Sequence, residues 1–141
     1  MTYLDASVIV AILGRESDAD ELIARLEASG GAFIVSPMGI FEAVIGLAAK
    51  KARDTGGALD AGLIDLAQQA VLKFVSEVGA TEIAVTPATG LAAIEAAKRY
   101  GRAVGSPAAL NFGDCFAYAC AREHGAALAY KGNDFVRTDL G

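Results

Sequence analysis

The sequence is poor in the residues from which most zinc, redox and nucleophilic sites are built. Its 141 residues include one histidine, two cysteines and no tryptophan. Cys115 and Cys120 would point about 140° apart on one helix, so we expect no disulfide and assign both to the core. His124 stands just before Gly125, where it is expected to end a helix and favour the helix dipole. The chain also has no P-loop and no G-x-G-x-x-G segment.

Long apolar runs and an excess of positive charge are also missing. No run approaches the roughly 18 residues that cross a bilayer, and Asp5 interrupts the position where a signal peptide would be apolar. We therefore expect a cytoplasmic protein whose residues 1–141 form a single domain. The net charge of −5 argues against a general nucleic-acid coat protein. It does not exclude an enzyme that handles nucleic acid locally through metal ions.

Short strand-like segments alternate with amphipathic helical segments along the whole chain. A helix over 7–14 would begin at Ser7 as its N-cap, and Pro37 opens another helix that Gly56 and Gly57 close. This alternation predicts parallel crossovers and an α/β sandwich. The predicted strands are 2–7, 32–36, 81–86 and 126–130, the last of which runs into a turn at 131–134. The predicted helices are 7–14, 17–31, 37–54, 58–78, 87–103 and 111–125.

Four acids stand in apolar or strand-end surroundings. Asp5 and Asp134 follow the first and last strands, whose carboxyl ends meet at one edge of a parallel sheet. Glu42 and Asp114 are surrounded by apolar and small residues. Each acid alone has an ordinary alternative role: a helix cap for Asp5, an edge residue for Glu42, a cap formed with Asn111 for Asp114, and a turn residue for Asp134.

Taken together, the four acids favour a cation site. Most of the other acids lie in ordinary charged surroundings, whereas a cluster of these four would destabilise the fold unless cations neutralised it. Oxygen ligands without histidine or cysteine favour Mg²⁺ or Mn²⁺ over zinc. Such an ion commonly polarises a phosphoryl group and generates hydroxide for in-line attack.

Four segments of the sequence carry a resemblance to a known family. They are YLDASVIVAIL, SPMGIFEAVIGLA, NFGDCFAYACAREHGAAL and KGNDFVRTDL. In this order they resemble the PIN-domain family, and specifically the VapC-type toxins of type II toxin–antitoxin modules. The resemblance places the family's four acids at Asp5, Glu42, Asp114 and Asp134, with Thr138 and Asp139 beside the last.

The resemblance implies a three-layer α/β/α sandwich with a central, mainly parallel sheet. It also implies a Mg²⁺-dependent endoribonuclease that cuts structured RNA, such as transfer or ribosomal RNA, and arrests translation. Asp5 and Asp114 would bind metal directly and Glu42 directly or through water, while Asp134 would complete the pocket or orient the attacking water. Ser7 either hydrogen-bonds in the site or caps a helix.

The resemblance further implies partners. It predicts a homodimer, and a VapB-type antitoxin whose tail occupies the active groove, often through an arginine, in a heterotetramer or larger complex. Two basic runs are candidates for RNA contact, although each is also typical of a solvated helix face. They are Lys50, Lys51 and Arg53, and Lys98, Arg99 and Arg102.

Two other functions compete with this interpretation. An aspartyl phosphatase usually carries a second acid two residues after the first, but Ser7 occupies that position. A catalytically inactive PIN-like protein-binding module would be expected to lack one or more of the four acids, and all four are present. The Gly- and Ala-rich segment 54–62 lies where VapC-type toxins vary, which bears on the substrate rather than on catalysis.

Overall fold

The computed structural model describes all residues from Met1 to Gly141, in which four short strands alternate with six α-helices. The strands are β1 (Thr2–Leu4), β2 (Phe33–Val35), β3 (Thr81–Glu82) and β4 (Ala127–Ala129). The helices are α1 (Ala6–Leu13), α2 (Ala19–Ser29), α3 (Pro37–Thr55), α4 (Ala61–Glu77), α5 (Pro87–Tyr100) and α6 (Phe112–Glu123), with a 3₁₀ turn, η1, at Arg102–Val104.

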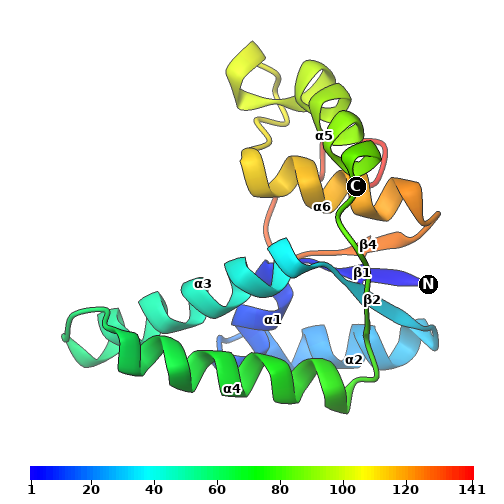
Figure 1. The fold of residues 1–141 in the computed structure, drawn as a ribbon. Helices are drawn as coiled ribbons and strands as arrows, with labels where there is room; N and C mark the ends of the chain where they lie inside the picture. Colours follow the sequence, from blue (N-terminus) through cyan, green and yellow to red (C-terminus); the bar gives the residue numbers. More distant parts are fainter.

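The strands form one sheet in the order β3-β2-β1-β4, and every neighbouring pair is parallel. Thr2 lies at the centre of this register, opposite Phe33 of β2 and Ala127 of β4. Helices α5 and α6 cover one face of the sheet, and α1 to α4 lie on the other (Figure 1). The predicted α/β/α sandwich with a parallel sheet is therefore confirmed.

Successive side chains of a strand point to opposite faces of the sheet, so the core is divided between the two faces. Tyr3 and Ile34 are buried with side chains from α5 and α6, whereas Leu4 and Val35 are buried with side chains from α1 to α4. The sheet is therefore apolar on both faces, as expected for parallel strands that helices cover on both sides.

The structure corrects the predicted start of the first helix. Strand β1 ends at Leu4, and Asp5 is the N-cap of α1, since its side chain accepts a hydrogen bond from the Ser7 backbone N–H. Ser7 is not the cap. β3 also ends well before its predicted limit of 86, whereas β4 lies within the predicted strand 126–130. After β3 the chain leaves the sheet and runs to α5.

Helices α3 and α4 extend away from the sheet as an antiparallel arm (Figure 1). Gly56 ends α3 in the left-handed conformation, with φ of 67°, which suits a residue without a Cβ. The exposed tip of the arm is the Gly- and Ala-rich segment 54–62. No helix of the protein is both long and apolar enough to cross a membrane.

The C-terminal segment is held against α6 rather than in a group with Asp134. The Tyr118 hydroxyl donates a 2.6 Å hydrogen bond to Asp139, and Arg122 lies 3.4 Å from the same carboxylate. These contacts hold the pKa of Asp139 below its usual value, with the Tyr118 hydrogen bond as the largest cause. Asp139 therefore fastens the end of the chain. The Thr138 hydroxyl likewise bonds locally, to the carbonyl of Phe135.

Ser36 caps the helix that carries Glu42, and we predict that Ser36→Ala destabilises the protein. Its fully buried hydroxyl accepts from the Gly39 N–H and shares a 2.8 Å hydrogen bond with Tyr3. Loss of the cap and of a buried partner should cost about 1–3 kcal/mol of unfolding free energy. Urea unfolding measures this loss. Ser76→Ala, at an exposed position of α4, is the matched control, and an equal effect of both changes would contradict the prediction.

Candidate active site at the carboxyl edge of the sheet

The four predicted site residues come from four different segments that meet at the carboxyl edge of the sheet. Asp5 directly follows β1, and Asp134 lies in the turn after β4. Glu42 projects from the first half of α3, and Asp114 from the first turn of α6. Their charges act on one another: Asp134 and Glu42 each interact with Asp5, and Asp114 interacts with Asp5, Glu42 and Asp134.

Asp5 is held rigidly by the start of α1. One carboxylate oxygen accepts hydrogen bonds from the backbone N–H and the hydroxyl of Ser7, at 3.0 and 2.5 Å. Burial nevertheless raises the pKa of Asp5, and the neighbouring Asp134 adds to the rise while the Ser7 bonds oppose it. Asp5 is therefore both a helix cap and a member of the acid group, so the two interpretations offered by the sequence are compatible.

Ser7 connects Asp5 to the chain that carries Asp134. Its hydroxyl oxygen, besides donating to Asp5, accepts a 3.0 Å hydrogen bond from the backbone N–H of Lys131. The Lys131 ammonium group contacts Glu16 and lies 3.0 Å from Asp18. These contacts fasten the segment after β4 to the connection between α1 and α2. The sequence offered Ser7 as a site residue, but gave no indication of its long-range partner.

Asp114 is also fixed by a helix start. It is buried, and it exchanges reciprocal hydrogen bonds with Asn111: its N–H donates to Asn111 Oδ1 at 2.9 Å, and its carboxylate accepts from the Asn111 N–H at 3.0 Å. Burial is the largest cause that raises the pKa of Asp114 to about 6, and Asp134 and Asp5 raise it further. The Asn111 hydrogen bond and the positive charge of Arg102 act in the opposite direction.

Glu42 reaches the group across the surface of α6. The residue as a whole is exposed, but its carboxylate lies directly against the backbone of Gly113. Desolvation of that carboxylate raises the pKa of Glu42 to about 7, and the charges of Asp5 and Asp114 contribute. Removal of water from one side and repulsion from two acids both favour the protonated form.

The four acids are near one another without forming a closed metal site. Asp134 is exposed, and no three His, Cys, Asp or Glu side chains are arranged as a preformed metal cage. The donor set is nevertheless the oxygen-only type that Mg²⁺ and Mn²⁺ prefer. Burial first, and then the neighbouring acids, raise the pKa values of Glu42 and Asp114, so negative charge at this edge is costly. A divalent cation would compensate that charge.

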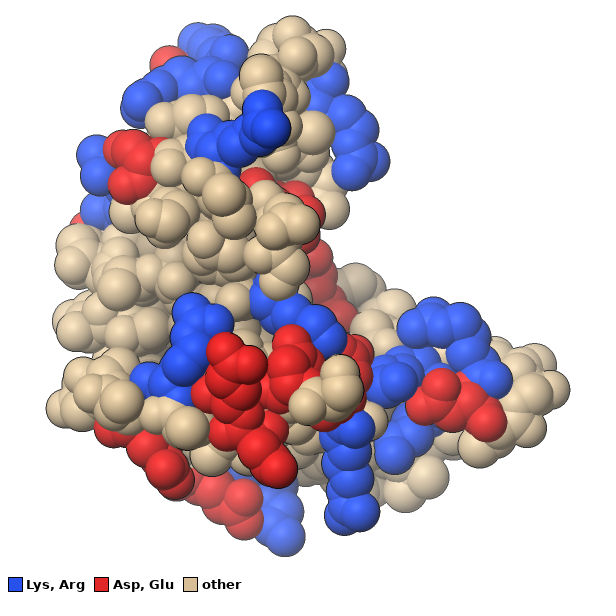
Figure 2. All heavy atoms as spheres, turned by 180° about the vertical axis from the view of Figure 1, so that it is seen from behind, with Lys and Arg blue, Asp and Glu red and all other residues tan.

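Basic side chains surround this acidic region. Figure 2 shows acidic side chains in the notch between the lobe of α5 and α6 and the arm of α3 and α4, with basic side chains on both walls. Several members of the basic runs already have partners: Lys50 pairs with Asp54, Lys98 pairs with Glu95, and Arg99 lies over the Tyr100 ring. The other three members of the two runs, Lys51, Arg53 and Arg102, are exposed and form neither an ion pair nor a cation–π contact.

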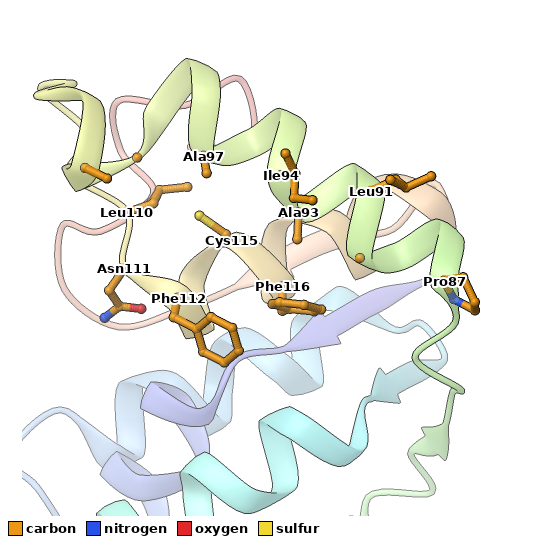
Figure 3. Close-up of a pocket in the computed structure, with 13 residues that line it drawn as sticks. Pro87, Leu91, Ala93, Ile94, Ala97, Leu110, Asn111, Phe112, Cys115 and Phe116 are labelled. Carbon is orange, nitrogen blue, oxygen red and sulfur yellow. The ribbon is translucent and has the colours of Figure 1, made fainter.

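A separate apolar groove of about 590 Å³ lies between α5 and α6 (Figure 3). Leu91 and Ile94 line one wall, and Phe112, Cys115 and Phe116 line the other (Figure 3). Cys115 and Cys120 are both buried with free thiols, as the sequence predicted. The groove has no charged lining residue, so the chemistry of the carboxylates is confined to the notch.

Comparison with known proteins places this arrangement in a family. The family model described as the PIN domain matches residues 2–140. The chain belongs to the PIN-domain family. It is 47% identical to a VapC ribonuclease of Rhizobium meliloti over the full length of both chains. It is 34% identical to the ribonuclease VapC28 of Mycobacterium tuberculosis, covering 97% of this chain and 93% of the relative.

A solved structure shares the fold of this PIN domain. The crystal structure of Mycobacterium tuberculosis VapC20, a sarcin-ricin loop cleaving toxin, superposes with a TM-score of 0.67 at 17% identity. The match covers 96% of this chain and 93% of that one. The predicted resemblance to the PIN-domain family and its VapC-type members is therefore confirmed.

The metal-free protein is predicted to lose stability as pH rises from about 4 to about 7. The folded-state pKa values of Asp114 and Glu42 lie above their ordinary values of 3.8 and 4.5, so the folded state binds more protons in this range. The two acids contribute this stability fully at pH below their unfolded-state pKa values, and the contribution is lost as pH rises through their folded-state pKa values. Asp114, the buried one of the two acids, should account for roughly 1–3 kcal/mol of the lost unfolding free energy.

Chemical unfolding at a series of pH values in EDTA measures this effect. Asp114→Asn should flatten the pH dependence, whereas Asp65→Asn, at an exposed position of α4, should leave it unchanged. A wild-type protein whose stability is constant or rises between pH 4 and pH 7 would contradict the predicted pKa shifts.

Proposed function

We propose that the protein is a VapC-type toxin that acts as a divalent-metal-dependent endoribonuclease. The observation that carries the proposal is the meeting of Asp5, Glu42, Asp114 and Asp134 at one edge of the sheet, with raised pKa values at three of them. The similarity to curated VapC ribonucleases over the full chain supports it. Residues 1–141 would act as one catalytic domain.

The four acids would differ in how they bind the metal, according to how firmly each side chain is held. Asp5 is fixed by Ser7 and Asp114 by Asn111, so these two would be the direct metal ligands. Glu42 and Asp134 are more exposed; Glu42 would bind directly or through water, and Asp134 would complete the pocket or orient the attacking water. A bound Mg²⁺, or Mn²⁺ in its place, supplies Lewis acidity at a phosphoryl oxygen and lowers the pKa of water.

The substrate that suits this site is structured RNA, such as transfer or ribosomal RNA, whose cleavage would arrest translation. Arg102, whose charge acts on Asp114, would contact phosphates beside the acids, and the unpaired Lys51 and Arg53 of α3 are further candidates for phosphate contact. Basic side chains on a protein with net charge −5 provide this contact only where no acid already neutralises them.

A cognate VapB-type antitoxin would inhibit the enzyme, and the toxin would be a homodimer that forms a heterotetramer or larger complex with it. The acidic notch suits an arginine of the antitoxin tail, because a guanidinium group forms paired hydrogen bonds with carboxylates. A short upstream gene that encodes a small DNA-binding protein with a disordered tail would support this part of the proposal.

The activity test uses the purified protein free of partner. We expect RNA cleavage with Mg²⁺ or Mn²⁺, no cleavage in EDTA, and a loss of about 100-fold or more in Asp5→Asn and Asp114→Asn. Gel analysis of total RNA and of purified transfer and ribosomal RNA measures it. Asp65→Asn is the charge-matched control and should cleave normally. Cleavage that persists in EDTA would refute the metal mechanism, and a folded but inactive wild type would favour the binding module.

Arg102 should contribute to RNA binding more than Lys98, because Lys98 is already paired with Glu95. Arg102→Ala should weaken RNA binding by about 1 kcal/mol and reduce the salt dependence of binding by the equivalent of one phosphate contact. Lys98→Ala should change both much less. Fluorescence anisotropy at several salt concentrations, in Ca²⁺ to prevent cleavage, measures the difference. If Arg102→Ala and Lys98→Ala weakened RNA binding equally, the absence of an ion pair in the free protein would not explain which cations contact RNA.

A further inference from the structure

Gly113 lies immediately before Asp114, at the place where Glu42 crosses from α3 to α6. A Cβ built on Gly113 would overlap both carboxylate oxygens of Glu42, which with its carboxyl carbon are the three nearest atoms. The position is buried at the second residue of α6. Its backbone does not adopt the left-handed conformation that favours glycine. The missing side chain is therefore explained by Glu42 and not by the path of the chain.

We propose that Gly113 is a positioning residue, whose missing side chain provides the space that Glu42 occupies beside Asp114 and Asp5. The inference rests on the proposed function, because it assigns Glu42 to the same metal site. Glycine lowers helix propensity relative to alanine, so the helix itself gains nothing from it at this position. The space it leaves lets an acid from one layer of the sandwich approach an acid from the other (Figure 1).

The neighbouring structure explains why the consequence would be local. The atoms that a Cβ would displace belong to the end of a flexible side chain on an exposed residue. Glu42 can therefore turn outward into solvent without disturbing the backbone of α3 or α6. Asp114 keeps its hydrogen bonds to Asn111, so the change removes one acid from the group and leaves the others in place.

Gly113→Ala tests the inference, with Gly62→Ala as a matched control. Gly62 is also the second residue of its helix, α4, and a Cβ there meets only ordinary contact with Asp60. Both variants should fold with unchanged or higher thermal midpoints. Gly113→Ala should cleave RNA about tenfold to 100-fold more slowly and bind Mn²⁺ more weakly by electron paramagnetic resonance. Gly62→Ala should match the wild type in both. A lowered thermal midpoint for Gly113→Ala alone would overturn the inference.

Rescue by a shorter acid separates positioning from a general structural role. Glu42→Asp shortens the side chain by one methylene and so withdraws the carboxylate from Gly113. In the Glu42→Asp protein, Gly113→Ala should therefore reduce the cleavage rate and the Mn²⁺ affinity much less than it does in the wild type. Equal costs in the two backgrounds would overturn the inference. A crystal structure of Gly113→Ala gives a result even if the wild type does not cleave RNA. A Glu42 carboxylate that remains beside Asp114 would refute the inference, whereas a displaced one would support it.

Discussion

Burial of several carboxylates together at one edge of a parallel sheet is the constraint on which the site depends. The parallel order places the ends of β1 and β4 side by side, and the residues that follow them are Asp5 and the turn with Asp134. Burial and mutual repulsion then raise the pKa values of Asp5, Glu42 and Asp114. A fold that gathers uncompensated charge in this way gives up stability at neutral pH, and a divalent cation would restore it.

The structure holds the two most buried acids by local hydrogen bonds and leaves the other two adjustable. Asp5 and Asp114 are each tied to a helix start, so their positions are set by the backbone. Ser7 extends this support across the molecule, because it bonds to both Asp5 and the Lys131 N–H. Two fixed acids and two movable ones suit a cation that must accept phosphate oxygens as further ligands.

Patterns local in the chain made most of the architecture predictable and marked four acids that the structure brings to one edge of the sheet. The alternation of apolar strands and amphipathic helices predicted the parallel sheet, and the apolar or strand-end surroundings of Asp5, Glu42, Asp114 and Asp134 suggested a shared cluster. The sequence offered both Ser7 and Asp5 as caps of α1, because two capping residues stand two positions apart and local sequence does not choose between them; the structure shows Asp5 as the cap. The predicted limit of the third strand, 86, was too long, because β3 ends at Glu82.

Contacts between distant segments account for what the sequence could not show. The Ser7 bond to Lys131 joins residues 124 positions apart, and the space at Gly113 is filled from α3. The sequence listed six cations as equal candidates for RNA contact, but only the fold shows which of them an acid already neutralises. A polyanion is attracted by local unpaired charge rather than by the net charge of the chain. A protein with net charge −5 can therefore bring a phosphodiester to a carboxylate site, provided that cations such as Arg102 stand beside the acids.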